Sequence, residues 1–270
     1  MRNLRVFSCF VALLLLLSLG LSAAEYDSVL DKVKDTGVLV VGIAQTTPGA
    51  YIDIDTGEWT GFTVKIFEQL AAEIDVELEI RETSWDLFLM ALNAGDFDVF
   101  GSTTFYLPTR ALQVAYTDPL LYKGVGLVVA ADDDRFNSLD DVKAAGDAVR
   151  VGVRLGAVEE TVTPQFFPDA ELVSYRTDTA PEIAEGVRAG IIDVWAADEV
   201  MQRIYLPSNP WAKLVGVVGS HPVGFVVRQG DDTWLSFLNS YIAFIRASGD
   251  LALYFEEFDQ PLGTLYPPQF

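Results

Sequence analysis

The stretch from Gly95 to Tyr122 decides the fold, and it reads Gly-Asp-Phe-Asp-Val-Phe-Gly-Ser-Thr-Thr-Phe-Tyr-Leu-Pro-Thr-Arg-Ala-Leu-Gln-Val-Ala-Tyr-Thr-Asp-Pro-Leu-Leu-Tyr. It begins with a short run, 98–100, that is typical of a buried strand. Small polar residues follow at 102–104, and Pro108 suits the first turn of a helix, where its missing N–H would be unpaired anyway. Arg110 falls inside that turn. Hydroxyls, free backbone amides and a guanidinium at one strand end predict a carboxylate site. The alternative for Arg110 is an exposed position on a helix surface.

The same stretch resembles the bacterial solute-binding proteins for polar amino acids, family 3, which serve ABC importers. Asp98, Ser102, Pro108 and Arg110 stand at the places of the family run Asp-(Val/Ala)-Ile-x-Ser-Gly-Met-Thr-Ile-Thr-Pro-Glu-Arg, and residues 116–119, Tyr-Thr-Asp-Pro, follow. The resemblance implies an α/β fold of the two-lobe, type II periplasmic binding protein class. Each lobe would be a mostly parallel sheet flanked by helices, with two hinge crossings between the lobes.

Strand and helix signals alternate on both sides of this stretch. Expected strands are 38–43, 76–80, 98–100, 124–130, 149–153, 172–175, 191–195, 214–219 and 224–227. Expected helices are 26–35, 181–189, 231–247 and 251–258, with others starting near 63, 84, 108 and 138. Ser84 and Ser138 are good N-cap residues for two of these helices. Alternating strands and helices indicate βαβ units and a parallel sheet.

The resemblance covers about Val38 to Phe258 and divides the chain into lobes. Lobe 1 is expected to be discontinuous, from 25–121 and 222–270, and lobe 2 to comprise 122–221. The crossings between them are expected near 120–123 and 220–223.

Residues 1–24 have the features of a signal peptide. Arg2 and Arg5 precede an apolar run from Phe7 to Leu21, and a small-residue cleavage site ends at Ala24. The apolar run is shorter than the roughly 18 residues that a membrane-spanning helix requires. Cleavage after Ala24 predicts a periplasmic protein.

The chain is strongly acidic, with 39 Asp and Glu against 18 Lys and Arg and a formal net charge of −21. Nucleic acid and anionic membranes are therefore not expected partners, because both require basic patches. An acidic surface fits either a saline habitat or an ordinary exported protein. The expected partners are a small zwitterionic ligand and the membrane permease of an ABC transporter, and the protein is expected to be a monomer.

A free amino acid is a zwitterion, so its site needs a cation, an anion and a shaped wall. Arg110 is the candidate cation. The resemblance places the anion at Asp198, just past the expected strand that contains Asp193. A helix-capping role suits Asp198 as well. An anion on the second lobe would let only a bridging ligand close the cleft.

The other candidate ligand contacts are mostly aromatic or apolar. Trp85 stands where the family often has an aromatic residue that stacks on the ligand, with a core Trp as the alternative. Phe105 replaces a Ser or Thr that meets the ammonium in many members. These two rings could contact an alkylated cation by cation–π attraction, and Tyr51 could add a third. The last three candidates are Thr103, whose hydroxyl suits the carboxylate, and Ala157 and Val158, which replace two family threonines.

These features predict a binding protein rather than an enzyme, for a polar amino acid or an ectoine- or betaine-like compatible solute. Hydrolase triads, metal sites and cofactors are not expected, because the chain after residue 24 has no Cys and only His221. The alternative function is a cyclohexadienyl (prephenate or arogenate) dehydratase, which shares this fold and needs one well-placed acid.

Overall fold

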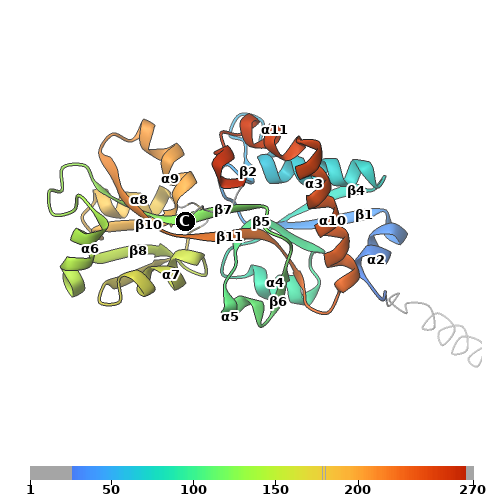
Figure 1. Ribbon diagram of the computed structural model, residues 1–270, viewed down its shortest axis with the longest axis horizontal. Coiled ribbons are helices and arrows are strands. Elements are labelled where there is room, and N and C mark those ends of the chain that lie inside the picture. The colour runs from blue at the N-terminus through green and yellow to red at the C-terminus, as the bar shows by residue number, and fades with distance from the viewer. Residues whose placement is uncertain (1–25, 178, 180, 266–270) are drawn as a thin grey trace, which may run out of the picture.

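The computed structural model describes residues 26–177, 179 and 181–265, and the expected signal peptide lies outside them. The described elements form two lobes, and two long strands run between them (Figure 1). Among these elements, no helix is both long and apolar enough to cross a membrane.

Lobe 1, on the right in Figure 1, is built from both ends of the described chain. Its elements are α2 (Val29–Thr36), β1 (Val38–Ile43), β2 (Tyr51–Ile52), β3 (Trp59–Thr60), α3 (Phe62–Glu73), β4 (Glu77–Glu82), α4 (Phe88–Ala94), β5 (Val99–Phe105), α5 (Pro108–Ala111), β6 (Val114–Tyr116), α10 (Asp232–Ser248) and α11 (Asp250–Glu257). β1 is buried from its second residue onward, which explains its continuous apolar sequence. A last turn, η3 (Leu262–Leu265), packs against α11 and against β7 (Leu121–Ala130), which is the first of the two strands that connect the lobes.

Lobe 2, on the left in Figure 1, comes from the middle of the chain. Its elements are α6 (Leu139–Ala145), η1 (Gly146–Ala148), β8 (Arg150–Arg154), α7 (Val158–Phe166), β9 (Glu171–Tyr175), α8 (Pro181–Arg188), β10 (Val194–Asp198), α9 (Glu199–Tyr205) and η2 (Leu206–Ser208). The connecting strands are β7 (Leu121–Ala130) and β11 (Ala212–Arg228). The exact lobe boundaries, 121/122 and 221/222, remain a prediction.

One continuous sheet runs through both lobes, in the order β4-β1-β5-β11-β7-β10-β8-β9, with β6 beside β11. β4, β1 and β5 are parallel in lobe 1, and β10, β8 and β9 are parallel in lobe 2. β7 and β11 are antiparallel to each other and join the two parallel groups. Polar loops after β5, β8 and β10 therefore converge where the lobes meet.

The two expected strands 214–219 and 224–227 form one strand, β11. Its pairing with β7 shifts register between Val218 and His221, where Gly219 has a φ of +67°. This bulge lies at the crossing between the lobes. The sequence pattern marks the bulge as a strand end because Gly and Pro interrupt the apolar run there.

One of the two expected serine caps is correct. Ser138 caps α6 and accepts a hydrogen bond from the Asp141 amide. The helix expected at Ser84 instead begins at Phe88, and Ser84 donates its hydroxyl hydrogen to Asp86 Oδ1 at 2.5 Å. The Ser84 hydroxyl thus bonds a side chain two residues further on and not a helix amide. Asp86 also forms an ion pair with Arg176 of lobe 2.

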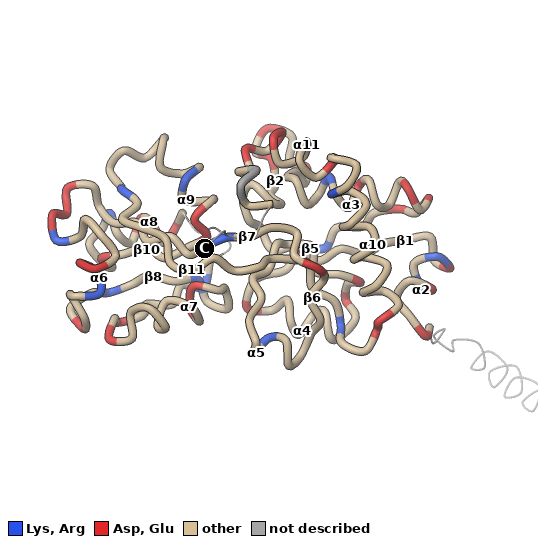
Figure 2. Tube along the Cα trace, viewed as in Figure 1, with Lys and Arg blue, Asp and Glu red and all other residues tan. Residues whose placement is uncertain are grey.

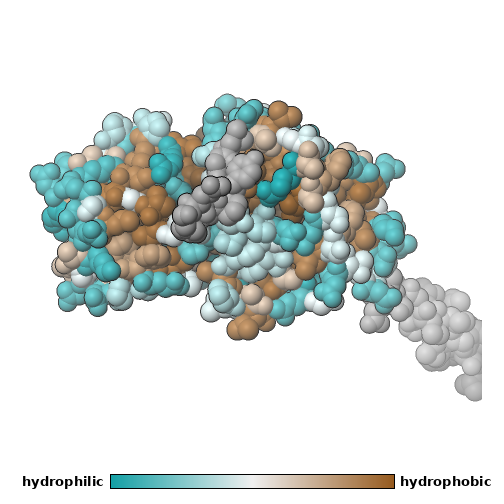
Figure 3. Space-filling view, viewed as in Figure 1, coloured by the Kyte–Doolittle hydropathy of each residue, from teal (hydrophilic) through white to brown (hydrophobic). Residues whose placement is uncertain are grey.

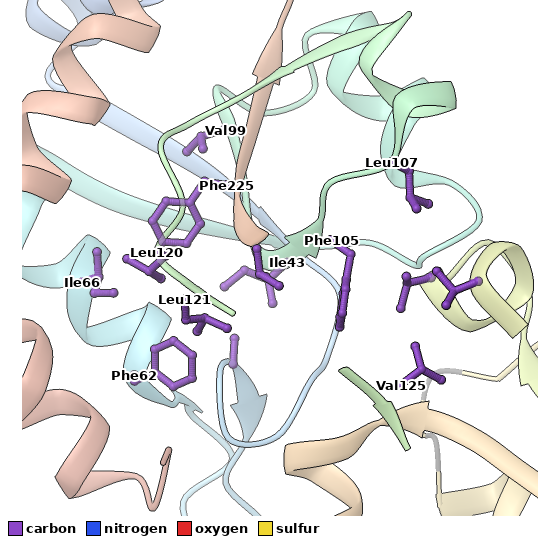
Figure 4. Close-up of a cluster of buried hydrophobic side chains, with 14 of the residues drawn as sticks. Ile43, Phe62, Ile66, Val99, Phe105, Leu107, Leu120, Leu121, Val125 and Phe225 are labelled. Atoms are coloured by element: carbon purple, nitrogen blue, oxygen red, sulfur yellow. The ribbon is translucent and has the colours of Figure 1, made fainter. Parts of the chain in front are cut away.

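Apolar side chains pack on both sides of the junction between the lobes. Figure 4 shows Phe105 at the end of β5, extending toward Val125 of β7, with Phe62, Ile66 and Phe225 packed deeper in lobe 1.

Charged residues are placed differently: Asp and Glu are spread over the outer loops and helices of both lobes (Figure 2). The face in Figure 3 has a hydrophilic rim and an apolar area over the centre of lobe 2.

Candidate functional site

A small cavity of about 30 Å³ lies between the lobes. Its lining residues from lobe 1 are Thr46, Trp85, Thr103, Phe105 and Arg110, and those from lobe 2 are Arg154, Ala157, Val158, Glu159, Asp198 and Met201. The structure thus brings together seven of the eight expected ligand contacts. The cavity has room for about one or two water molecules, so an amino acid can enter only if the lobes separate or side chains move.

Arg110 projects from α5, where Pro108 occupies the first helical position as expected. The residue is only 7 % exposed, and its guanidinium lies over the ring of Phe88, 5.5 Å from the centroid. Its Nη2 donates a hydrogen bond across the cleft to the Gly156 carbonyl oxygen. Burial lowers the pKa of Arg110 from its ordinary value, but an Arg side chain stays protonated in proteins. The cleft therefore contains a permanent, desolvated cation.

Gly156 lies just before the N-terminus of α7, directly opposite Arg110. Ala157 is the N-cap residue of α7 and provides no side-chain cap. Helix N-termini attract anions through their free amides and the helix dipole. The guanidinium of lobe 1 and this N-terminus of lobe 2 therefore face the same place, and both suit a carboxylate.

Asp198 stands at the end of β10, and its carboxylate has two structural partners. Oδ1 accepts hydrogen bonds from the amides of Val200 and Met201, at 2.9 and 3.5 Å, and so caps α9. Oδ2 accepts one from Lys123 Nζ at 2.6 Å. The capping role, one of the two alternatives for Asp198, is present, and Asp198 also lines the cavity. Its contact with a ligand stays a prediction.

Lys123 is a buried cation beside the cavity that the sequence pattern did not single out. It lies at the start of β7, is 1 % exposed, and places Nζ 3.5 Å from Thr103 Oγ1 as well as beside Asp198. A Lys inside an apolar strand is itself a signal, because a buried ammonium needs a charged partner. The partner is 75 residues away in the sequence, so the pattern alone does not identify it.

Arg154 and Glu159 were also missed, and both are buried in the lobe 2 wall. The Arg154 guanidinium carbon lies 6.0 Å from the centroid of the Trp85 ring, across the cleft. Glu159 Oε1 accepts a hydrogen bond from the Arg154 amide at 3.3 Å. Burial raises the pKa of Glu159, and the charge of Arg154 opposes that rise. Trp85 thus lines the cavity as expected, with a cation of the protein itself near its ring.

Phe105 forms the apolar part of the wall. It is 5 % exposed and contacts His221 edge to face, with ring centroids 6.1 Å apart. Burial lowers the pKa of His221 below its ordinary value, which favours the neutral imidazole near pH 7. His221 accordingly belongs to the crossing and packs behind Phe105.

Tyr51 is the one expected contact that does not line the cavity. It lies in the hairpin of β2 and β3, paired with Thr60. Thr46, which precedes that hairpin, lines the cavity instead. The loop 45–60 has no strong periodicity, so the sequence did not distinguish the two positions.

Contacts outside the cavity also hold the lobes together. Arg176 of lobe 2 pairs with Asp86 of lobe 1. A Cβ atom on Gly156 would lie 2.7 Å from the Trp85 carbonyl oxygen, so the two backbones nearly touch. The structure is therefore that of a closed cleft. Over the described residues, no cluster of His, Cys, Asp and Glu could hold a metal ion.

Comparison with known proteins gives relatives along most of the chain. A probable amino-acid ABC transporter-binding protein of Haemophilus influenzae is 25% identical over 227 residues, covering 82% of this chain and 84% of the relative. The L-cystine-binding protein TcyJ of Escherichia coli K12 is 27% identical over 237 residues, covering 86% and 87%.

Solved structures agree with the two-lobe fold. An ancestral amino acid-binding protein, AncCDT-1, described as a precursor of cyclohexadienyl dehydratase, matches with a TM-score of 0.76 and 29% identity, covering 86% of this chain and 99% of its own. A mutant of ArgBP from T. maritima matches with a TM-score of 0.77 and 26% identity, at the same coverage.

The sequence model of one family spans most of the chain. It is described as bacterial extracellular solute-binding proteins, family 3, and it matches residues 39–259. Its members and the named relatives are binding proteins, as the sequence predicted. The chain belongs to the bacterial extracellular solute-binding proteins of family 3, and it is a binding protein rather than an enzyme.

Proposed function

We propose that this protein captures a free amino acid in the periplasm, after cleavage behind Ala24, and delivers it to the permease of an ABC transporter. Family membership supports an extracellular binding role. The names of the curated relatives, which include amino-acid, cystine and histidine binders, support an amino acid as the ligand. The protein acts as a monomer whose two lobes close on the ligand.

One observation carries the proposal: complementary groups for an amino acid line a single cavity from opposite lobes. Arg110 from lobe 1 and the α7 N-terminus from lobe 2 hold the α-carboxylate. Arg110 already bonds the Gly156 carbonyl next to that N-terminus, so a carboxylate inserted there meets both. Asp198 lines the same cavity and accepts from the ammonium with the lone pairs that its existing bonds leave.

The ligand closes the protein because it completes contacts that neither lobe can make alone. In the open state Arg110 and the α7 amides face water. Bridging by a carboxylate favours the closed state by its differential affinity. Thr103 and Phe105 shape the lobe 1 wall, and Ala157 and Val158 the lobe 2 wall, so the walls exclude water around the charged groups.

The cyclic or alkylated solutes have less support than amino acids. A betaine-like cation would need the face of Trp85, yet the Arg154 guanidinium lies 6.0 Å from the centroid of that ring. The dehydratase alternative is not favoured either, since the solved relative that mentions it is described as an amino acid-binding protein.

A thermal-shift screen of the twenty amino acids, L-cystine, ectoine, glycine betaine and prephenate tests the proposal. A ligand at 100 times its dissociation constant stabilises the folded state by about 2.7 kcal/mol, which raises the melting temperature measurably. We expect at least one amino acid to do so. A shift with ectoine or betaine alone, or turnover of prephenate, would contradict the proposal.

A further inference from the structure

Two cations beside the cavity are matched by carboxylates of the protein. Lys123 Nζ lies 2.6 Å from Asp198 Oδ2. Glu159 Oε1 accepts a hydrogen bond from the Arg154 amide at 3.3 Å. Burial raises the pKa of Glu159, and the charge of Arg154 opposes that rise because it stabilises the carboxylate. Each of these pairs compensates its own charges, so neither needs a charged group of the ligand.

Arg110 is the third cation, and it bonds a neutral group, the Gly156 carbonyl. Burial lowers its pKa, and the groups that act in the opposite direction include the Glu159 and Glu160 carboxylates. Glu160 is held nearby, because its Oε2 accepts from the Gly156 amide at 2.9 Å. With the two pairs above, three cations stand against three carboxylates in and around the cavity. A zwitterionic ligand has no net charge and keeps this balance.

A charged ligand side chain would disturb the balance. The cavity is small and its lining is largely buried, so solvent screens an added charge weakly. A buried charge without a partner is costly. The groups that could serve as partners are already engaged with one another. The side chain of a glutamate or lysine ligand would therefore carry this cost, and an uncharged side chain avoids it.

The cavity lining is also largely apolar. Its apolar members are Trp85 and Phe105 from lobe 1 and Ala157, Val158 and Met201 from lobe 2. Phe105 and Met201 are only 5% and 6% exposed, and the ring of His221 packs against that of Phe105. Phe105 has no group that forms a conventional hydrogen bond. A charged group beside it would lose its water without a replacement.

We propose that the ligand is an amino acid with an uncharged side chain, and that Phe105, together with Met201, excludes charged side chains. The inference rests on the proposed function, because Arg110 and the α7 N-terminus still hold the α-carboxylate and Asp198 the ammonium. An uncharged side chain is either apolar or an amide, and ligands of matched size distinguish the two.

Calorimetric titration of the purified chain at neutral pH tests the class of ligand. One series is L-leucine, L-asparagine and L-aspartate, and the other is L-methionine, L-glutamine, L-glutamate and L-lysine. L-Cystine, whose far end carries two charges, is titrated beside them. We expect an uncharged member to have a dissociation constant at least tenfold lower than every charged member of its own series.

Two results would overturn this inference and leave the proposed function standing. One is a difference smaller than tenfold in both series. The other is tighter binding of a charged member, or of L-cystine, than of every uncharged member. Failure of every amino acid to bind would overturn both the inference and the proposed function.

Variants of Phe105 test its role directly. The quantity to compare is the ratio of the dissociation constant of a charged ligand to that of its uncharged counterpart. Phe105→Ser supplies a hydroxyl and space for water, so this ratio should fall at least fivefold. Phe105→Leu keeps the wall apolar and should keep the ratio within twofold. Phe244→Ser is the control, since Phe244 is 52% exposed on α10 and outside the cavity.

Met201→Gln tests the same wall from lobe 2. It places an amide in the cavity lining, so it should also lower the ratio, and it serves if Phe105→Ser does not fold. An unchanged ratio in a folded Phe105→Ser protein, or in Met201→Gln if only that variant folds, would exclude the apolar wall as the source of the selection.

Discussion

Gly156 of lobe 2 lies against the backbone of Trp85 in lobe 1. A Cβ atom on Gly156 would fall 2.7 Å from the Trp85 carbonyl oxygen and 2.9 Å from the Asp86 Cα. Neither neighbour is a flexible side chain that could move aside. Only glycine therefore permits this approach, and the same residue supplies the carbonyl that Arg110 bonds. Closure of the cleft depends on a position without a side chain.

Gly156→Ala should weaken ligand binding at least tenfold while the protein still folds. The open state has no such contact, so the methyl group penalises closure specifically. The φ of +76° adds a backbone cost to both states, of about 1 kcal/mol or somewhat more. Calorimetric titration measures the affinity, and small-angle scattering with ligand measures the compaction.

Gly190→Ala is the matched control for this substitution. Gly190 also lies in lobe 2 and has a φ of +69°, but nothing lies within 4 Å of its Cβ position. It should lose similar stability and keep full affinity. If Gly156→Ala bound ligand as well as Gly190→Ala, the close approach of the two backbones would not matter for function.

The buried pair of Lys123 and Asp198 should be costly to break from one side. Lys123→Met leaves the Asp198 carboxylate without its cation, and removing one partner of a buried pair typically costs about 3–5 kcal/mol. Urea unfolding measures this loss. The double variant Lys123→Met with Asp198→Asn should recover a large part of it, because Asn still caps a helix.

The surface pair of Lys65 and Glu68 is the control for this prediction. Its side chains are 41% and 49% exposed, so Lys65→Met should change the free energy of unfolding by no more than about 0.5 kcal/mol. A loss at Lys123 as small as that at Lys65 would show that the Asp198 carboxylate finds another cation or water.

His221 should make the stability depend on pH. Burial lowers its pKa in the folded protein below the ordinary 6.5, so the unfolded chain binds the proton more readily. Stability from this group is therefore complete above about pH 6.5 and is lost as the pH falls below it. The free energy of unfolding of the wild type should fall relative to that of His221→Gln between about pH 7 and pH 5.

The difference between the two proteins is the quantity to measure, because the many carboxylates titrate in both. Urea unfolding at each pH gives it. The free energy of unfolding of the wild type, relative to that of His221→Gln, could instead stay constant or rise as the pH falls. Either result would mean that the folded protein does not disfavour the charged imidazole.

The sequence predicted the elements whose signals are local. The apolar run of β1, the Pro at the start of α5 and the Ser138 cap are as expected, since each depends on a few adjacent residues. The helix near Ser84 was placed too early. There the Ser84 hydroxyl bonds the carboxylate of Asp86 and not a helix amide, and Asp86 also pairs with Arg176, 90 residues away.

The site shows the same difference between residues with local sequence signals and residues whose contacts are distant in the sequence. Arg110 and Asp198 could be predicted because motifs surround them, and they do line one cavity. Lys123 and Arg154 could not, because a charged residue in an apolar strand or at its end indicates a buried cation without identifying the group that it contacts. Their roles come from groups in other elements, Asp198 for Lys123 and the Trp85 ring for Arg154, and no local pattern records such contacts.

Titration of an amino acid into the wild type, Arg110→Gln and Arg81→Gln by calorimetry tests the central claim most directly. Arg81 is a half-exposed Arg of the same lobe and lies outside the cavity. We expect the wild type and Arg81→Gln to bind with equal affinity, and Arg110→Gln to lose about 2–5 kcal/mol of binding free energy, the usual effect of removing one partner of a buried charge pair. Undiminished binding by a folded Arg110→Gln protein would contradict amino-acid capture between the lobes.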